Sequence, residues 1–228
     1  MGQPYNHARD RIPVRYLSAI SVCALFALMI KSTFLMALEL EELSVTEIDG
    51  EYRLHFVSVL DANMDYVYKV ITDYKNAYRI SPSITKVEIL PSVRDEVIRV
   101  KNLSEHWVGP FCFSLKWVGD IIERRHGHLE IKTIPEYSSF DAGFSTWDLQ
   151  PQGNRTLVSY NSNMKPDFFI PPLIGKHIVK SYIERDALNT FARIECFAKI
   201  QLDIDMENET EPMSNVLADG KHCLNSQS

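Results

Sequence analysis

The sequence lacks the short motifs by which many enzymes and metalloproteins are recognised. Its four cysteines are far apart, and no Cys-x-x-Cys pair or Cys/His spacing typical of a metal site occurs. It has no glycine-rich phosphate loop, no Gly-x-Ser-x-Gly elbow and no Ser-His-Asp order typical of hydrolases. We therefore expect no metal and no cofactor, and the sequence assigns no catalytic residue.

Only two of the cysteines, Cys112 and Cys196, fall in the part of the chain that we expect to fold. A disulfide between them is possible in an oxidising compartment. Because a free cysteine often packs as a small apolar side chain, two unpaired thiols are the favoured interpretation.

Clusters of basic residues are also missing from the chain, whose formal net charge is −6. Residues 1–38 carry Arg9, Arg11, Arg15 and Lys31 against Asp10 alone, so the remainder has 20 basic and 29 acidic residues. An acidic domain repels the phosphate backbone of a nucleic acid. We therefore expect no nucleic-acid partner.

The longest apolar run, Tyr16–Ile30, follows the basic residues near the N-terminus. A basic stretch before an apolar one is the layout of a secretory signal peptide. A membrane anchor over about residues 16–38 is equally compatible, because about 20 apolar residues span a bilayer. Both interpretations of residues 1–38 place the following domain outside the cytoplasm, either periplasmic or secreted after cleavage, or held at the membrane.

The rest of the chain reads as strands followed by one long helix. After a linker over residues 39–49 we expect a strand over 51–60, a helix from Met64 and a short helix or turn over 75–80. Six strands should follow. Their ranges are residues 84–90, 96–103, 111–122, 128–134, 140–149 and 155–164.

The apolar period changes to 3.6 between Pro172 and Ala198, which predicts the long helix. Its stripe includes Ile174, Ile178, Tyr182, Phe191 and Ile194, so it must lie against something large and apolar. Residues 200–228 are polar, acidic and without period, which predicts a disordered tail.

Two segments carry a resemblance to a known family. Residues 61–90, DANMDYVYKVITDYKNAYRISPSITKVEIL, contain a helix, the Asp73-Tyr74 pair, Ser81-Pro82 and a returning strand. Residues 145–166, STWDLQPQGNRTLVSYNSNMKP, add a Trp-x-Leu strand, a loop and a further strand. With the final helix, this order resembles the START-like (SRPBCC) superfamily, including its polyketide cyclase/dehydrase and coenzyme Q-binding families.

The resemblance covers about residues 50–199 and implies an α+β helix-grip fold, in which a curved antiparallel sheet of about seven strands surrounds the C-terminal helix. It also implies a cavity between the sheet and that helix, which in this superfamily holds lipids, isoprenoid quinones, hormones or polyketides. We expect seven apolar or aromatic residues to line it. These are Phe113, Leu115, Trp117, Trp147, Tyr160, Ile183 and Phe191.

Five histidines are further candidates, namely His55, His106, His126, His128 and His177. His126 and His128 flank a turn glycine without a third metal ligand, so a solvated turn is favoured. His55 could point inward from its strand as a general base, although a structural role is favoured. The family fixes no universal catalytic residue, so the resemblance assigns none.

We therefore expect a monomer that binds or carries a hydrophobic small molecule or lipid without catalysis. One alternative is an enzyme of the cyclase/dehydratase type, and another is a protein-interaction module whose groove receives a partner. The membrane would be a further partner only if the N-terminal segment is not cleaved.

Overall fold

The structure of the chain is a computed structural model, and it describes residues 38–92, 94–108, 111–170 and 175–207. The expected signal peptide or anchor lies outside the described residues, apart from Leu38. Within these described ranges, no helix combines the length and the apolar character needed to cross a membrane.

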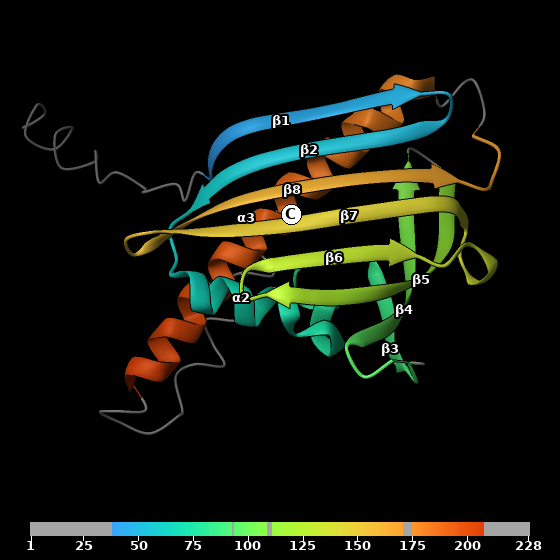
Figure 1. Cartoon of the computed structure of the whole chain (residues 1–228). Helices are drawn as coiled ribbons and strands as arrows, with labels where there is room; N and C mark the ends of the chain where they lie inside the picture. The colour runs from blue at the N-terminus through green and yellow to red at the C-terminus, as the bar shows by residue number, and fades with distance from the viewer. Residues whose placement is uncertain (1–37, 93, 109–110, 171–174, 208–228) are drawn as a thin grey trace, which may run out of the picture. The chain divides into compact units, whose positions relative to one another are not determined.

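Eight antiparallel strands form a single sheet in the order β1-β2-β8-β7-β6-β5-β4-β3. The sheet curves strongly, so that β4 crosses the direction of β2 and β8 (Figure 1). The long strand β5 spans the bend. The strand bounds are β1 Glu39–Ile48, β2 Glu51–Leu60, β3 Ile84–Leu90, β4 Val97–Val108, β5 Phe111–Arg125, β6 His128–Thr133, β7 Phe140–Gln152 and β8 Arg155–Pro166.

Short helices connect the second and third strands. In helix α2, Met64–Thr72, the side chain of Asn63 accepts a hydrogen bond from the backbone N–H of Asp65 at 2.9 Å, which caps the first turn. The 3-10 helix η1 follows at Tyr74–Arg79, and a second one, η2, covers Pro135–Tyr137.

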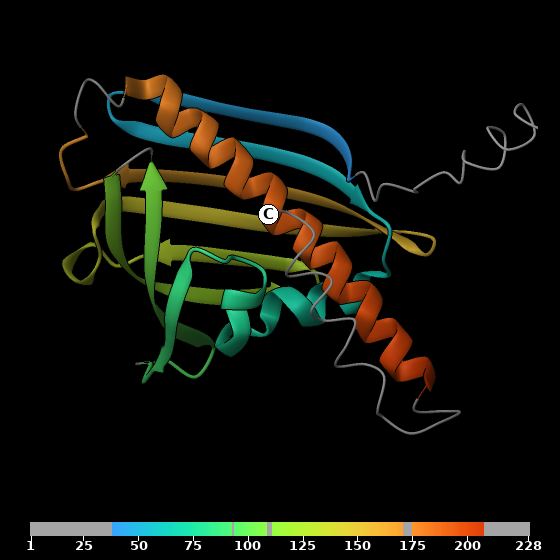
Figure 2. The ribbon, with the colours of Figure 1, turned by 180° about the vertical axis from the view of Figure 1, so that it is seen from behind.

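The long helix α3, Gly175–Glu207, lies diagonally across the concave face of the sheet (Figure 2). Its buried residues Ala187, Phe191, Ile194 and Ala198 follow the 3.6-residue period and face the sheet. The ring of Phe191 stacks on Phe56 of β2 with 3.9 Å between centroids. This packing confirms the α+β helix-grip fold.

The eighth strand corrects the expected count of about seven. Strand β1 occupies Glu39–Ile48, where we expected a linker over residues 39–49. Val45 is its one buried residue, because β1 lies at the edge of the sheet and its other side chains are exposed or half-buried. The hairpin to β2 turns at Asp49 and Gly50, which both have positive φ angles.

Helix α3 also differs from the expected range of Pro172–Ala198. Pro172 lies outside the described residues, and the helix continues to Glu207, eight residues into the segment expected to be a disordered tail over residues 200–228. The apolar stripe stops where the helix leaves the sheet, so periodicity could not mark the true end. Residues 208–228 lie outside the described residues.

The Cys112–Cys196 disulfide, which the sequence disfavours, does not form, because Cys112 is a free and exposed thiol. Cys196 is itself disulfide-bonded, so the expectation of two unpaired thiols is wrong for Cys196. Cys112 lies on β5 on the face opposite Phe113, which turns its side chain away from α3.

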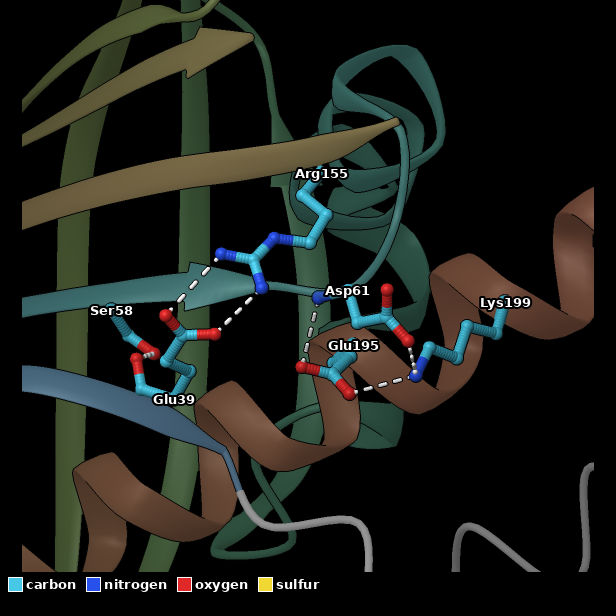
Figure 3. A network of polar contacts seen from close by, with 6 residues as sticks. All are labelled: Glu39, Ser58, Asp61, Arg155, Glu195 and Lys199. Atoms are coloured by element: carbon cyan, nitrogen blue, oxygen red, sulfur yellow. Dashed lines mark hydrogen bonds and ion pairs between the residues drawn. The ribbon is translucent and has the colours of Figure 1, made fainter. Parts of the chain in front are cut away.

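A polar network fixes the C-terminal half of α3 to the sheet (Figure 3). Lys199 Nζ lies 2.8 Å from Asp61 Oδ2 and 3.0 Å from Glu195 Oε1, and Glu195 Oε2 accepts a hydrogen bond from the Asp61 backbone N–H at 3.2 Å. Beside it, Arg155 of β8 pairs with Glu39 of β1 at 2.7 Å. The network therefore joins α3 to the end of β2 and β1 to β8.

Candidate functional site

A cavity of about 460 Å³ lies between the concave face of the sheet and the N-terminal half of α3. The sheet contributes wall residues from β2 and from β3 to β8. Further wall residues come from α2, η1, α3, the segment before β3 and the segment after β8. All seven residues that the sequence predicts as cavity-lining lie in this wall. These are Phe113, Leu115, Trp117, Trp147, Tyr160, Ile183 and Phe191.

The predicted residues form the apolar side of the cavity. Phe113, Leu115 and Trp117 alternate along β5, which places them on one face of the strand. The rings of Trp147 and Tyr160 approach to 4.5 Å between centroids. Phe191 is only 1% exposed, so it belongs to the core as much as to the wall. Whether these side chains contact a ligand stays a prediction.

Strand β4 brings a polar row beside that apolar side. Asn102, Ser104 and His106 lie on its inner face and line the cavity. The register pairs them with Trp117, Leu115 and Phe113 of β5, respectively. Residues that pair directly across two strands share a face, so each of these three wall residues of β5 has a polar neighbour.

Helix α3 places a second row of polar residues opposite the polar row of β4. Tyr182 and Asp186 are one helical turn apart and both line the cavity. The phenol oxygen of Tyr182 lies 2.7 Å from His106 Nδ1, and His106 Nε2 lies 2.7 Å from Ser104 Oγ. Ser83 donates to Asp186 Oδ1 at 3.3 Å and lies 3.2 Å from the Tyr182 hydroxyl.

Burial shifts the titration of these three groups. It lowers the pKa of His106, against the opposing attraction of Asp186. Burial raises the pKa of Asp186, although His106 and the hydrogen bond from Ser83 counteract it, and burial also raises the pKa of Tyr182. A lowered pKa keeps His106 neutral at pH 7, with one ring nitrogen as donor and the other as acceptor.

Hydroxyl groups on the opposite wall satisfy one another. Ser145 of β7 donates to Ser162 of β8 at 2.9 Å, and the Tyr160 hydroxyl donates to Ser145 at 3.4 Å. The indole N–H of Trp117 donates to Thr133 Oγ1 at 2.9 Å. These bonds leave the polar atoms of that wall mutually paired.

The Asp73-Tyr74 pair of the resemblance has a structural role. Asp73 accepts hydrogen bonds from the side chain of Asn76 at 2.8 and 3.0 Å, which organises the turn into η1. Tyr74 lines the cavity and donates to Glu123 of β5 at 2.8 Å. Tyr68 of α2 donates to the same carboxylate, and its burial and this bond raise the pKa of Tyr68 to about 12.

The remaining histidine candidates lie away from the cavity. His55 is on the outer face of β2, where it lies 2.6 Å from Asn161 Oδ1, so the idea of an inward general base is wrong. His126 and His128 each bond to a carboxylate, Asp65 at 2.8 Å and Asp148 at 2.6 Å. These contacts fit the structural roles that the sequence favours.

Sequence reasoning missed the polar side of the cavity, apart from His106, which was one of the histidine candidates but had no assigned role. The register of β4 against β5 would have revealed Asn102, Ser104 and His106, because they pair with the predicted wall residues. In the sequence, Tyr182 belongs to the apolar stripe of the helix, and Asp186 lies outside that stripe. No local motif marks these residues, because they meet only after the sheet curves.

Comparisons with known proteins agree with this geometry. Residues 60–186 match the family described as polyketide cyclase / dehydrase and lipid transport. No curated protein matches the sequence.

Several solved structures share the fold. Zhui aromatase/cyclase from Streptomyces sp. R1128 is 14% identical with a TM-score of 0.56, and covers 67% of this chain and 96% of its own. Human StAR-related lipid transfer protein 5 is 10% identical with a TM-score of 0.54, and covers 81% and 96%. A START superfamily protein from Mycobacterium smegmatis is 12% identical with a TM-score of 0.50, and covers 63% and 97%.

At these identities the solved structures show a shared fold, and they include both a cyclase and a lipid transfer protein. The family match covers more than half of the chain and includes α2, the sheet from β3 to β8 and α3 up to Asp186. The resemblance seen in the sequence is thereby confirmed, and the chain belongs to the polyketide cyclase / dehydrase and lipid transport family.

Proposed function

We propose that this domain binds and carries a hydrophobic small molecule in the cavity under α3, without transforming it. The observation that carries the proposal is the cavity of about 460 Å³, whose wall is mainly apolar and aromatic. Ligand pockets of roughly 300–1,000 Å³ with this lining bury most of a drug-sized molecule. The described residues enclose a cavity and not a filled core, and a filled core is what would favour an interaction module.

Native mass spectrometry of the full-length chain purified from its own cells tests the proposal. We expect a discrete hydrophobic passenger that lipid extraction recovers. A chain that is reproducibly empty, and that also takes up no lipid or quinone analogue, would refute carriage.

Catalysis of the cyclase/dehydratase type is the second candidate. The observation in its favour is the hydrogen-bonded chain in which His106 contacts Tyr182 and Ser83 joins Tyr182 to Asp186. Groups with shifted pKa values in a cavity are candidate acids and bases. The variant His106→Gln separates the two functions. A carrier should yield the same passenger from the variant and the wild type, whereas an enzyme should accumulate a different molecule, its unconverted substrate, in the variant.

We also propose that the domain works outside the cytoplasm. The basic residues Arg9, Arg11 and Arg15 followed by the apolar run Tyr16–Ile30 support this placement. Fractionation with protease protection in the native cells tests it, and N-terminal sequencing distinguishes a cleaved signal peptide from an anchor. Recovery of the full-length chain in the soluble cytoplasmic fraction would refute the proposal.

A further inference from the structure

The wall of the cavity carries a negative charge without a positive one. Among the described residues that line it there is no lysine or arginine, and Asp186 of α3 supplies a carboxylate. His106 also lines the cavity, but burial lowers the pKa of His106 and so leaves it neutral at pH 7. An anionic headgroup would lose its hydration there and gain no counter-ion, whereas a cationic headgroup would gain one.

Asp186 lacks the cationic partner that other carboxylates withdrawn from solvent have in this domain. Asp120 pairs with Arg99 at 2.7 Å, and Glu195 pairs with Lys199 at 3.0 Å. No lysine or arginine among the described residues forms an ion pair with Asp186, and burial raises the pKa of its carboxyl group. A charge in such a place is costly without a partner, so this carboxylate calls for a cation from outside the chain.

One oxygen of Asp186 is available to such a cation. Ser83 donates to Oδ1 at 3.3 Å, while Oδ2 accepts no hydrogen bond from a described residue. The side-chain atoms that are both buried and unpaired in the described ranges are Asn102 Oδ1 and Asn163 Oδ1, so Asp186 Oδ2 is not sealed from solvent. Because Asp186 lines the cavity, a ligand there can reach this oxygen.

Two hydroxyl groups flank that carboxylate on the same face of α3. Tyr182 lies one turn before Asp186 and Thr190 one turn after it, and both line the cavity. An ammonium group has three N–H donors, so it can donate to the carboxylate and to a hydroxyl oxygen beside it. The apolar side of the cavity would bury the rest of the molecule.

From these features we infer that the cavity takes a hydrophobic amine whose protonated nitrogen pairs with Asp186. Neutral polar ends also bind, because Ser81 and Thr190 offer hydroxyl groups on the same wall, but they bind more weakly than an ammonium group on the same apolar chain. An anionic end binds least. This inference rests on the carrier function proposed above and names the class of its ligand.

Three probes with the same apolar chain and different polar ends test the inference on the wild-type protein. The full-length chain, stripped of endogenous lipid, is loaded with the uncharged fluorophore N-phenyl-1-naphthylamine at pH 7.5. It is then titrated with decylamine, 1-decanol or decanoate, and displacement gives the relative affinities. We expect decylamine to bind at least about tenfold more tightly than 1-decanol, and decanoate to bind more weakly than 1-decanol.

The outcomes separate this inference from the carrier function. An affinity for decylamine no greater than that for 1-decanol, or a preference for decanoate, would overturn the inference and leave the carrier function standing. Binding of neither the fluorophore nor any probe would overturn both.

The substitution Asp186→Asn tests whether the preference arises at Asp186. The amide keeps the shape of the side chain and can still accept from Ser83, but it carries no charge. We expect decylamine affinity to fall at least about tenfold while 1-decanol affinity changes little, because only the amine loses a counter-ion. Equal losses for the two probes, or an unchanged decylamine affinity, would overturn the pairing with Asp186.

The variant Glu105→Gln is the matched control for the loss of one negative charge. Glu105 is exposed on β4, and it points to the outer face because its neighbours Ser104 and His106 line the cavity. An amine attracted to the acidic surface in general would respond equally to both substitutions, which would overturn the inference, whereas an amine in the cavity responds to Asp186→Asn alone. Thermal unfolding of each variant checks the fold, and the comparison of probes on the wild type needs no substitution.

Discussion

Lys199 provides the sharpest test of how α3 is held. Its ammonium group pairs with Glu195, whose side chain is 9% exposed, and with Asp61, which is 69% exposed. In Lys199→Met the apolar stem of the side chain is kept, but Glu195 becomes a buried charge with one remaining donor, the Asp61 backbone N–H at 3.2 Å. Loss of the ion pair should cost little at Asp61, because water solvates its exposed carboxylate.

Breaking a fully buried ion pair from one side costs about 3–5 kcal/mol. Lys199 is 23% exposed, so water and the retained hydrogen bond relieve part of that cost. We expect the free energy of unfolding to fall by about 2–4 kcal/mol, which corresponds to roughly 5–15 °C in Tm for a domain of this size. Urea denaturation with an unchanged m value measures it.

The double variant Lys199→Met/Glu195→Gln supplies the control. If the cost arises from the uncompensated charge of Glu195, neutralising that residue should restore about 1–2 kcal/mol, because an amide oxygen can still accept from Asp61. Equal stability of the single and double variants would refute this reasoning, as would a loss below about 0.5 kcal/mol in Lys199→Met.

Three further substitutions follow from the structure. Phe191→Ala removes a ring that is 1% exposed and should cost about 3–5 kcal/mol in urea denaturation. Because burial lowers the pKa of His106, the unfolded state binds more protons than the folded state below about pH 6.5; stability should therefore fall as the pH drops through that value, and His106→Gln should lose this component. The raised pKa of Asp186 acts with the opposite sign, because it makes stability fall as the pH rises above the ordinary carboxyl value of 3.8. The comparison of variant with wild type therefore isolates the histidine. Gly119→Ala would place a methyl group against the Trp117 ring, cost about 1–3 kcal/mol and shift the tryptophan emission of the cavity wall.

The elements that sequence predicted well are those in which burial repeats with a regular period. Strand β5 alternates Phe113, Leu115 and Trp117 inward, and α3 repeats its apolar residues every three or four positions. Both patterns arise from packing against a large apolar partner. They predicted the long helix and include five of the seven wall residues. Trp147 and Tyr160 lie on β7 and β8, and the helix-grip expectation came from the family resemblance.

Elements without such a pattern were missed for a physical reason. Strand β1 owes its place to backbone hydrogen bonds with β2 and buries only Val45, so its acidic sequence reads as a linker. The last turns of α3 continue past the sheet, where no stripe is needed. Backbone pairing and helix propensity leave little trace in a single sequence.

The polar side of the cavity was invisible for a different reason. A polar residue on a strand is ordinarily expected to face water. The sequence alone does not distinguish Asn102, Ser104 and His106, which face inward, from the neighbouring residues of β4 that face outward. Only the register against β5 shows that they share a face with Trp117. A cavity wall breaks the rule that the inner face of a sheet is apolar, because part of that face borders the cavity instead of the packed core.

The two halves of α3 meet different physical demands. Over the cavity, the row of Tyr182, Asp186 and Thr190 is polar while Ala187 beside it is buried, so one turn of helix presents both chemistries. Beyond Phe191 the helix packs on the core through Ile194 and Ala198, and the Lys199 network ties it to the sheet (Figure 3). Substitutions in the first half should therefore change ligand binding with little change in stability. Substitutions in the second half should lower stability with little change in ligand binding. A Lys199→Met protein that loses its hydrophobic passenger while remaining folded would show that the two halves are not independent.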